Sequence, residues 1–363
     1  MIFGKKIDYD FMYNNKCLDI VQNYKYLGVL FNSVSRCNSN IFTDAYTHIA
    51  NQARKAMFKV LKDTKSIGVL PPDVALKLFD SLVLPILEYS SEIWFRNKEI
   101  NEIESIQIKF IKTILGVHGN TSNLAVLGET GRFPLVIRQK VKSLKYWSKI
   151  LTLPDHSLVK KMYFILYDLN EAGYQTWCTN IEEMLCQSDL KVKWDQQHCD
   201  NNTIKYFNDV LQQKYVNYWY ESINDNILHP KLRTYCQFKK LFCMEPYLLN
   251  ITDFKLRRQL SKFRLSNHNL HIEKGRHVKP KTPVEERLRN ICKRILIEDE
   301  FHFICVCEQY TDLRDYFFNK IIAMGFYGNH FKLEDILNFS EGSLHLAKFL
   351  TKMFKKRKCI LED

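Results

Sequence analysis

The sequence predicts a mainly α protein with a small β segment at its start. Glycine and proline are scarce among the 363 residues, at 12 and 9, which suits long helices better than a barrel or a sandwich. Apolar residues recur at three- and four-residue steps over much of the chain, whereas residues 1–35 carry short strand-like runs. With 46% hydrophobic residues, the chain can bury a core across two or three domains.

The predicted β segment spans residues 1–35. Met1–Phe3 is apolar and predicts a first short strand. Tyr26–Phe31 is a second strand-like run, followed by the turn formers Asn32 and Ser33.

Four amphipathic helices are predicted in residues 36–152. Pro85 lies inside the second helix and should kink it, because proline lacks a backbone donor and clashes with the preceding turn. Gly116 is placed to end the third helix. The predicted spans are Ile41–Lys62, Val74–Trp94, Ile103–Ile114 and Pro134–Leu151.

The rest of the chain divides into two further segments. Residues 153–250 are predicted as a less regular helical connector that is rich in aromatic side chains. Residues 251–363 combine a basic run, a cluster of Cys and His, and a closing helix from about Ser343 to Lys356. The predicted organisation is therefore 1–35, 36–152, 153–250 and 251–363.

A basic segment stands out in the last of these. The chain carries a formal charge of +13, but the position of the charge indicates a partner better than its sum does. From Lys255 to Arg294 there are thirteen Lys or Arg against three acidic residues. Such a density predicts salt-sensitive binding to phosphates, and the alternative is a solvated charged face.

The predicted nucleic-acid-binding residues come from this basic segment. Its first four recur at helical spacing and predict one phosphate-facing stripe. The full set is Arg257, Arg258, Lys262, Arg264, Arg276, Lys279, Lys281, Arg289, Lys293 and Arg294.

Targeting signals are not apparent in the sequence. The first six residues lack the apolar run of a signal peptide, and no stretch reaches the ~18 consecutive apolar residues of a membrane helix. The eleven cysteines follow no repeating framework. We therefore expect a nuclear or cytoplasmic protein with reduced thiols and no membrane partner.

Several short phrases occur in a fixed order along the chain. They are NYKYLG at 23–28, LPILEYSSEIW at 84–94, IESIQIKFIK at 103–112 with Leu115-Gly116, LGETG at 127–131, RLSNHNLHIEKGRH at 264–277, EERL at 285–288, EDEFHF at 298–303 and YTDLR at 310–314. In this order they resemble the palm end, thumb and C-terminal region of non-LTR retrotransposon (LINE-type) reverse transcriptases. Ser90 departs from the family pattern, which has glycine there. The resemblance covers most of the chain and is weakest over 153–250.

The resemblance implies palm-end strands in 1–35 and a thumb-like helical domain in 36–152.

The resemblance also implies that this chain lacks polymerase activity. In this family, a paired Asp-Asp on a preceding hairpin helps to hold two metal ions for polymerisation. This sequence contains no Asp-Asp pair, and Asp8 and Asp10 have no such partner. We expect no polymerase activity and no catalytic Mg site in this chain alone.

A degenerate zinc knuckle is the second implication of the resemblance. The family pattern is C-x2-C, a spacer and H-x4-C, which suits tetrahedral zinc. Cys292, His302 and Cys307 occupy its second, third and fourth positions, and Arg289 stands at the first. Cys305 is one candidate for the missing ligand, although an extended backbone would turn its thiolate to the other face.

Other readings of this Cys/His unit stay open. His277 or a water molecule are further candidates for the fourth zinc ligand. The metal-free alternative is a hydrophobic turn around Phe301, Phe303 and Tyr310, in which the cysteines act as small apolar residues.

Three functions follow from these observations. The leading one is a nucleic-acid-binding fragment that grips RNA or an RNA–DNA duplex by its backbone. The second is one part of an active split reverse transcriptase, complemented by a separate fingers–palm polypeptide. The third is a scaffold or decayed protein without retained activity.

Overall fold

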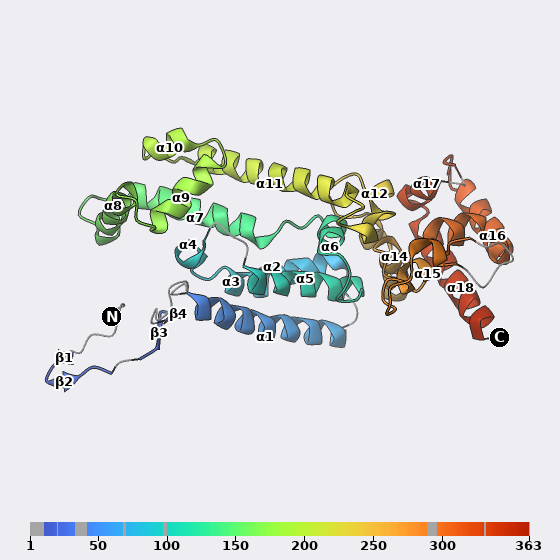
Figure 1. The fold of residues 1–363 in the computed structure, drawn as a ribbon, viewed down its shortest axis with the longest axis horizontal. Helices are drawn as coiled ribbons and strands as arrows, with labels where there is room; N and C mark the ends of the chain where they lie inside the picture. The colour runs from blue at the N-terminus through green and yellow to red at the C-terminus, as the bar shows by residue number, and fades with distance from the viewer. Residues whose placement is uncertain are drawn as a thin grey trace. The chain divides into compact units, whose positions relative to one another are not determined.

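The computed structural model describes residues 11–19, 21–32, 42–67, 70–96, 100–288, 296–329 and 332–362. Within these ranges the chain is mainly helical and contains two small antiparallel sheets (Figure 1). The predicted fold class is confirmed at this level. No helix in the same ranges is long and apolar enough to cross a membrane.

The strands form two hairpins near the start of the chain. One pairs β1 (Met12–Tyr13) with β2 (Lys16–Cys17), and the other pairs β3 (Asn23–Tyr26) with β4 (Val29–Asn32). The predicted strand Tyr26–Phe31 is divided between β3 and β4, because Leu27 and Gly28 form a turn with φ of 45° and 86°. Positive φ at both central residues matches the twist of a tight hairpin. The predicted strand Met1–Phe3 and the residues Asp8 and Asp10 lie outside the described ranges.

The helices of the first half follow the predicted periodicity. Three of the four predicted helices are confirmed as α1, α5 and α7, and Gly116 follows the end of α5 with φ of 68°. The bounds are α1 (Thr43–Ile67), α2 (Pro72–Leu82), α3 (Leu84–Leu87), α4 (Ser91–Trp94), α5 (Asn101–Leu115), α6 (Asn123–Thr130) and α7 (Leu135–Leu151).

The predicted helix Val74–Trp94 is divided into α2, α3 and α4. Pro85 lies in the first turn of α3, where its missing N–H would have no helical partner in any case. Ser90 precedes α4 in the left-handed conformation, with φ of 53° and ψ of 23°. Two backbone breaks therefore replace the single predicted kink.

Helices continue through the rest of the chain. They are α8 (Leu158–Glu171), α9 (Trp177–Cys186), α10 (Lys191–Asp195), α11 (Asn201–Asn224), α12 (Tyr235–Phe238), α13 (Tyr247–Asn250), α14 (Phe254–Arg264), α15 (His271–Lys274), α16 (Thr311–Ile322), α17 (Leu333–Asn338) and α18 (Ser343–Glu362). The 3-10 segments are η1 (Pro230–Leu232), η2 (Val284–Glu286) and η4 (Glu308–Tyr310), and the π-helix is η3 (His302–Val306).

The chain forms two compact units, each built from discontinuous segments. Unit 1 contains 1–63, 78–107 and 134–212, and unit 2 contains 64–77, 108–133 and 213–363. Four of the five unit boundaries fall inside α1, α2, α5 and α11, and the fifth lies between α6 and α7.

Unit 1 has its core where α7 packs against its neighbours. Helix α7 contacts α4, α8 and α9, and α7 to α10 are grouped together in Figure 1. Trp147 is fully buried and donates from Nε1 to the Tyr163 hydroxyl at 2.9 Å. The Trp147 ring lies 5.7 Å from the ring of Trp194. These aromatic side chains explain why the connector region is rich in Trp and Tyr.

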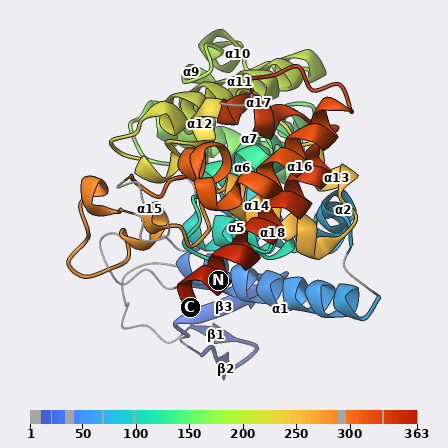
Figure 2. The ribbon, with the colours of Figure 1, turned by 90° about the vertical axis from the view of Figure 1, so that its right-hand side faces the viewer.

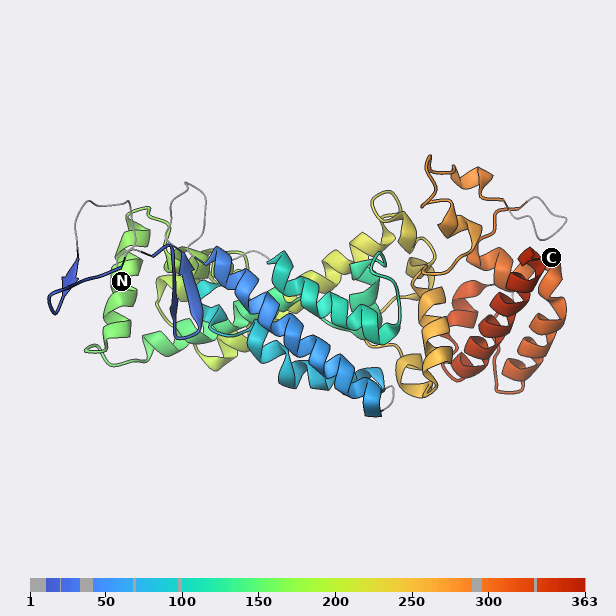
Figure 3. The same cartoon turned by 90° about the horizontal axis from the view of Figure 1, so that it is seen from below.

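Unit 2 is organised around α18. This helix contacts α13, α14 and α16, and Figures 2 and 3 show it beside α14 and α16. Phe317 of α16 stacks on Phe349 of α18 with ring centroids 4.5 Å apart and planes 2° apart. The closing helix is longer than predicted and runs to Glu362. Packing of α14 on α18 fixes which basic side chains of α14 face solvent.

Candidate nucleic-acid interface

Helix α14 forms the first part of the basic segment. Its N-terminus is capped by Asp253, whose carboxylate accepts hydrogen bonds from the backbone N of Lys255 at 2.7 Å and of Leu256 at 3.1 Å. The cap fixes the start of the helix. The side-chain directions of the following arginines and lysines then depend on the helical period.

Two residues of the predicted phosphate-facing stripe are buried, so the stripe is corrected. Arg257 is 2% exposed and donates to the backbone oxygens of Ile251 at 2.7 Å and Leu70 at 3.3 Å. Arg264 is also 2% exposed and pairs with Glu129, at 2.6 Å. Residues seven positions apart share a helix face, and this face of α14 points into unit 2. Neither guanidinium is placed to meet a phosphate.

Arg258 and Lys262 lie four residues apart on the other face of α14. Arg258 is exposed and donates from Nε to the backbone oxygen of Gly116 at 3.0 Å. Lys262 is half-buried, and burial together with the charge of Arg258 lowers the pKa of its ammonium. A bound anion would stabilise the charged form of this lysine.

The other predicted contact residues lie after α15. Arg276 holds the local chain, because Nε lies 3.2 Å from Glu273 and Nη2 donates to the backbone oxygen of Pro230 at 2.8 Å. Lys279 and Lys281 are exposed. The predicted residues outside the described ranges are Arg289, Lys293 and Arg294.

Buried ion pairs fix the chain that follows α14. Glu300 accepts from Arg233 at 2.8 Å and lies 2.9 Å from Nε2 of His268. Burial opposes ionisation, but the hydrogen bond with His268 and the charge of Arg233 hold the pKa of Glu300 at about 2. Arg233 also donates to Glu273 at 2.7 Å. Glu298 pairs in the same way with Arg357, at 2.6 Å.

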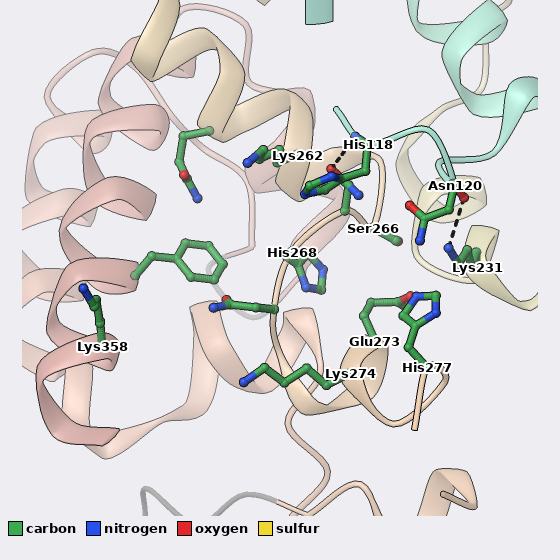
Figure 4. Close-up of a pocket in the computed structure, with 14 residues that line it drawn as sticks. His118, Asn120, Lys231, Lys262, Ser266, His268, Glu273, Lys274, His277 and Lys358 are labelled. Atoms are coloured by element: carbon green, nitrogen blue, oxygen red, sulfur yellow. Dashed lines mark hydrogen bonds between the residues drawn. The ribbon is translucent and has the colours of Figure 1, made fainter. Parts of the chain in front are cut away.

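A cavity of about 500 Å³ lies beside this network within unit 2. Figure 4 shows its lysines around His268, each approaching from a different side. Glu273 is the one carboxylate among the described residues that line it, and that carboxylate is bound to Arg233 and Arg276. The lysines are Lys231, Lys262, Lys274 and Lys358.

The lysines reach the cavity from η1, α14, α15 and α18. Lys231 is held at the rim by a hydrogen bond from Nζ to the backbone oxygen of Asn120 at 3.1 Å. Burial and the charge of Arg276 lower the pKa of Lys231, and the charge of Glu273 opposes this shift. On the same rim, the backbone N of His118 donates to Oδ1 of Asn267 at 3.0 Å. Crowded, partly desolvated cations create a positive potential that attracts anions.

Sequence reasoning missed most of these lining residues. Lys274 lies in the basic run predicted from the sequence, and Lys358 lies in a separate group of basic residues at 352–358. Lys231 and His118 lie far from either run and carry no local signal. Only the fold of unit 2 brings these four residues to one cavity.

The described part of the Cys/His unit packs into the interior. His302–Val306 is a π-helix that contains Cys305, and Cys307 follows it with an extended backbone, at φ of −62° and ψ of 123°. Cys305 and Cys307 are 2% and 1% exposed. Burial raises the pKa of the Cys305 thiol to about 12.

A zinc-ligand set is not assembled by the described residues alone. Within them, no three His, Cys, Asp or Glu side chains are grouped to hold a metal. Cys292 and Arg289 lie outside the described ranges, so the zinc site stays a prediction. Of the metal-free alternative, Phe303 and Tyr310 are buried with rings 5.1 Å apart, whereas Phe301 is 40% exposed.

Comparison with protein-family models, curated proteins and solved structures finds no match to this chain. The resemblance to non-LTR reverse transcriptases therefore rests on the order of its sequence phrases.

Proposed function

We propose that this chain binds nucleic acid through the lysine-lined cavity of unit 2 and the exposed Lys279 and Lys281 nearby in sequence. The observation that carries the proposal is a cavity with four lysines whose one described carboxylate is already paired with arginines. Lysines that neutralise phosphates release counterions, which favours binding without strong sequence preference. RNA or an RNA–DNA duplex is the proposed partner.

The order of the sequence phrases supports a narrower proposal. In the family that they resemble, such a grip would hold the template for target-primed reverse transcription. Two contacts join these phrases in pairs: the Tyr89 hydroxyl donates to the Leu27 backbone oxygen at 2.6 Å, and Arg264 pairs with Glu129. We propose a thumb-like and C-terminal fragment of such a protein that is inactive as a polymerase on its own, since it has no Asp-Asp pair.

The test is binding of the full chain to structured RNA and to an RNA–DNA duplex across a salt series. Affinity should fall steeply with salt, and the triple variant Lys262→Ala, Lys274→Ala, Lys358→Ala should reduce the slope of log affinity against log salt by about two to three. The matched control removes three exposed lysines of unit 1, Lys145, Lys149 and Lys205. No binding by folded protein at low salt would overturn the proposal, and so would an equal effect of the two triple variants.

A second candidate function, as one part of a split reverse transcriptase, is supported by the apolar surface of the two hairpins. The two hairpins expose several large apolar side chains, among them Met12 at 60%, Tyr13 at 69% and Leu27 at 73%. Exposed apolar patches often mark docking surfaces, and the resemblance places the palm end here. A separate fingers–palm polypeptide would then complete a split reverse transcriptase. Primer extension that appears only when both polypeptides are mixed would support it, and its absence despite a stable complex would contradict it.

A further inference from the structure

His268 is a buried histidine whose orientation is fixed on one side. Its side chain is 1% exposed, and Nε2 lies 2.9 Å from Oε1 of Glu300. The Glu300 carboxylate stays ionised at neutral pH, because its pKa is about 2. An ionised carboxylate only accepts hydrogen bonds, so Nε2 carries a hydrogen and Nδ1 is the ring nitrogen left for another partner.

The other ring nitrogen of His268, Nδ1, has no protein partner among the described residues. No described residue forms a hydrogen bond with Nδ1 of His268 or with Oγ of Ser266, although both atoms are buried. Both residues line the cavity, and Figure 4 places them next to each other on its wall. Buried polar atoms are almost always paired, so this wall is suited to a ligand that brings hydrogen-bonding groups of its own.

Aromatic and amide side chains complete the wall. The His268 ring lies 5.4 Å from the ring of Phe263 and 6.4 Å from that of Phe354, and Phe354 lines the cavity. Aromatic rings of this kind stack on unpaired bases, and amides bind the edges of bases. The lining amides are Asn120, Gln259, Asn267 and Asn269.

We propose that the cavity takes one unpaired nucleotide of a single strand, with the base at His268, Ser266 and Phe354 and the phosphates among the lysines. This inference rests on the proposed nucleic-acid binding and specifies the form that is bound. The cavity volume of about 500 Å³ lies within the range of small-molecule sites, roughly 300–1,000 Å³. Bases inside a duplex are stacked and paired, so a duplex would offer this wall only its backbone.

The experiment compares two chains of equal charge. One is an oligouridylate of about 12 nucleotides, a typical length for single-strand binding, whose uracil edge carries a donor at N3–H and acceptors at O2 and O4 for Nδ1 of His268. The other is a ribose–phosphate chain of the same length without bases. We expect the oligouridylate to bind about tenfold more tightly, as one stacked and hydrogen-bonded base would give, with the same salt slope for both.

The variant His268→Gln separates the base contact from the phosphate contact. Glutamine keeps a donor near the position of Nε2 and removes Nδ1. We expect it to reduce affinity for the oligouridylate towards that for the abasic chain and to leave abasic binding unchanged. If His268→Gln does not fold, as judged by circular dichroism, Ser266→Ala serves for the same comparison.

Each outcome gives a decision. Equal affinity of the wild-type protein for both chains, with a shared steep salt slope, would overturn the nucleotide site and leave the phosphate-binding proposal standing. An unchanged preference for the oligouridylate in the folded variant would also overturn the site. No binding of either chain at low salt would overturn both proposals.

Discussion

Arg264 and Glu129 form a fully buried ion pair, with Nε of the guanidinium 2.6 Å from Oε1 of the carboxylate. The pair joins α14 to α6 within unit 2. Nη2 of Arg264 binds Glu245 at 2.6 Å, and the guanidinium lies over the Phe238 ring at 4.5 Å. Glu129 belongs to the LGETG phrase and Arg264 begins the basic one. Arg264 therefore belongs to the most basic part of the sequence and yet stabilises the fold.

Replacing Arg264 should lower the free energy of unfolding rather than weaken nucleic-acid binding specifically. Arg264→Ala would leave Glu129 buried without a partner charge, which typically costs about 3–5 kcal/mol. Urea unfolding would measure the loss. Lys279→Ala is the control. Because Lys279 is exposed, the free energy of unfolding of this variant should stay within about 0.5 kcal/mol of the wild-type value. If the Arg264→Ala protein were as stable as wild type but bound RNA weakly, the structural role of Arg264 would be wrong and a phosphate-binding role would be supported.

Gly128 and Gly119 make a matched pair for testing the packing of α6. A Cβ at Gly128 would lie 2.6 Å from Cζ2 of the fully buried Trp219. Gly128→Ala should therefore cost about 1–3 kcal/mol, as overpacked cores do. At Gly119 an added Cβ meets nothing within 4 Å, so Gly119→Ala should be close to neutral. Thermal unfolding of both variants would check this, and equal losses would contradict the packing.

The local pattern was sufficient to predict the three longest of the helices α1 to α7. Apolar residues at three- and four-residue steps predicted α1, α5 and α7, because one face of each helix is buried. The turn at Leu27–Gly28 was missed because leucine rarely adopts positive φ. The apolar run at 26–31 therefore looks like one continuous strand in the sequence. The contact of the Tyr89 hydroxyl with the Leu27 backbone oxygen at this turn is visible only in the fold.

The sequence was sufficient to locate the basic region, but not to tell which of its residues line the cavity and which are buried in the fold. Charge density predicted the region, and α14 does present Lys262 to the cavity. Composition could not show that α14 turns Arg257 and Arg264 inward, since that depends on which face packs in unit 2. Lys231 joins the site through contacts between distant segments, for which a single sequence carries no signal.

Ser90 should respond to substitution in a way that reveals its backbone strain. The left-handed conformation costs a residue with a Cβ about 1–2 kcal/mol, and the Ser90 side chain makes no capping hydrogen bond to α4. Ser90→Gly should therefore raise the free energy of unfolding by up to about 1 kcal/mol, after the greater entropy of glycine in the unfolded chain is subtracted. Ser90→Val should lower it by about 1–2 kcal/mol. A less stable glycine variant, measured by urea unfolding, would show that the conformation is not strained.

Glu300 should make the stability of the protein depend on acid. Its pKa in the folded protein is about 2, against 4.5 for the free side chain. A lowered carboxyl pKa means that the stabilisation is complete above about pH 4.5 and is lost as the pH falls through about 2. Glu298 acts in the same direction, whereas the pKa of Asp299 is raised by burial and acts in the opposite one.

Glu300→Gln tests this assignment through the shape of the pH profile. The variant should be less stable than wild type at neutral pH, since Arg233 and His268 lose a charged partner, and should lose less additional stability between about pH 4.5 and 2. Urea unfolding at a series of pH values would measure both effects. Glu334→Gln is the control, because Glu334 is exposed on α17 and its removal should leave the profile unchanged. An equally steep acid loss in Glu300→Gln would assign the pH dependence to other carboxylates, so the comparison separates the His268–Glu300–Arg233 network from the general effect of acid on the fold.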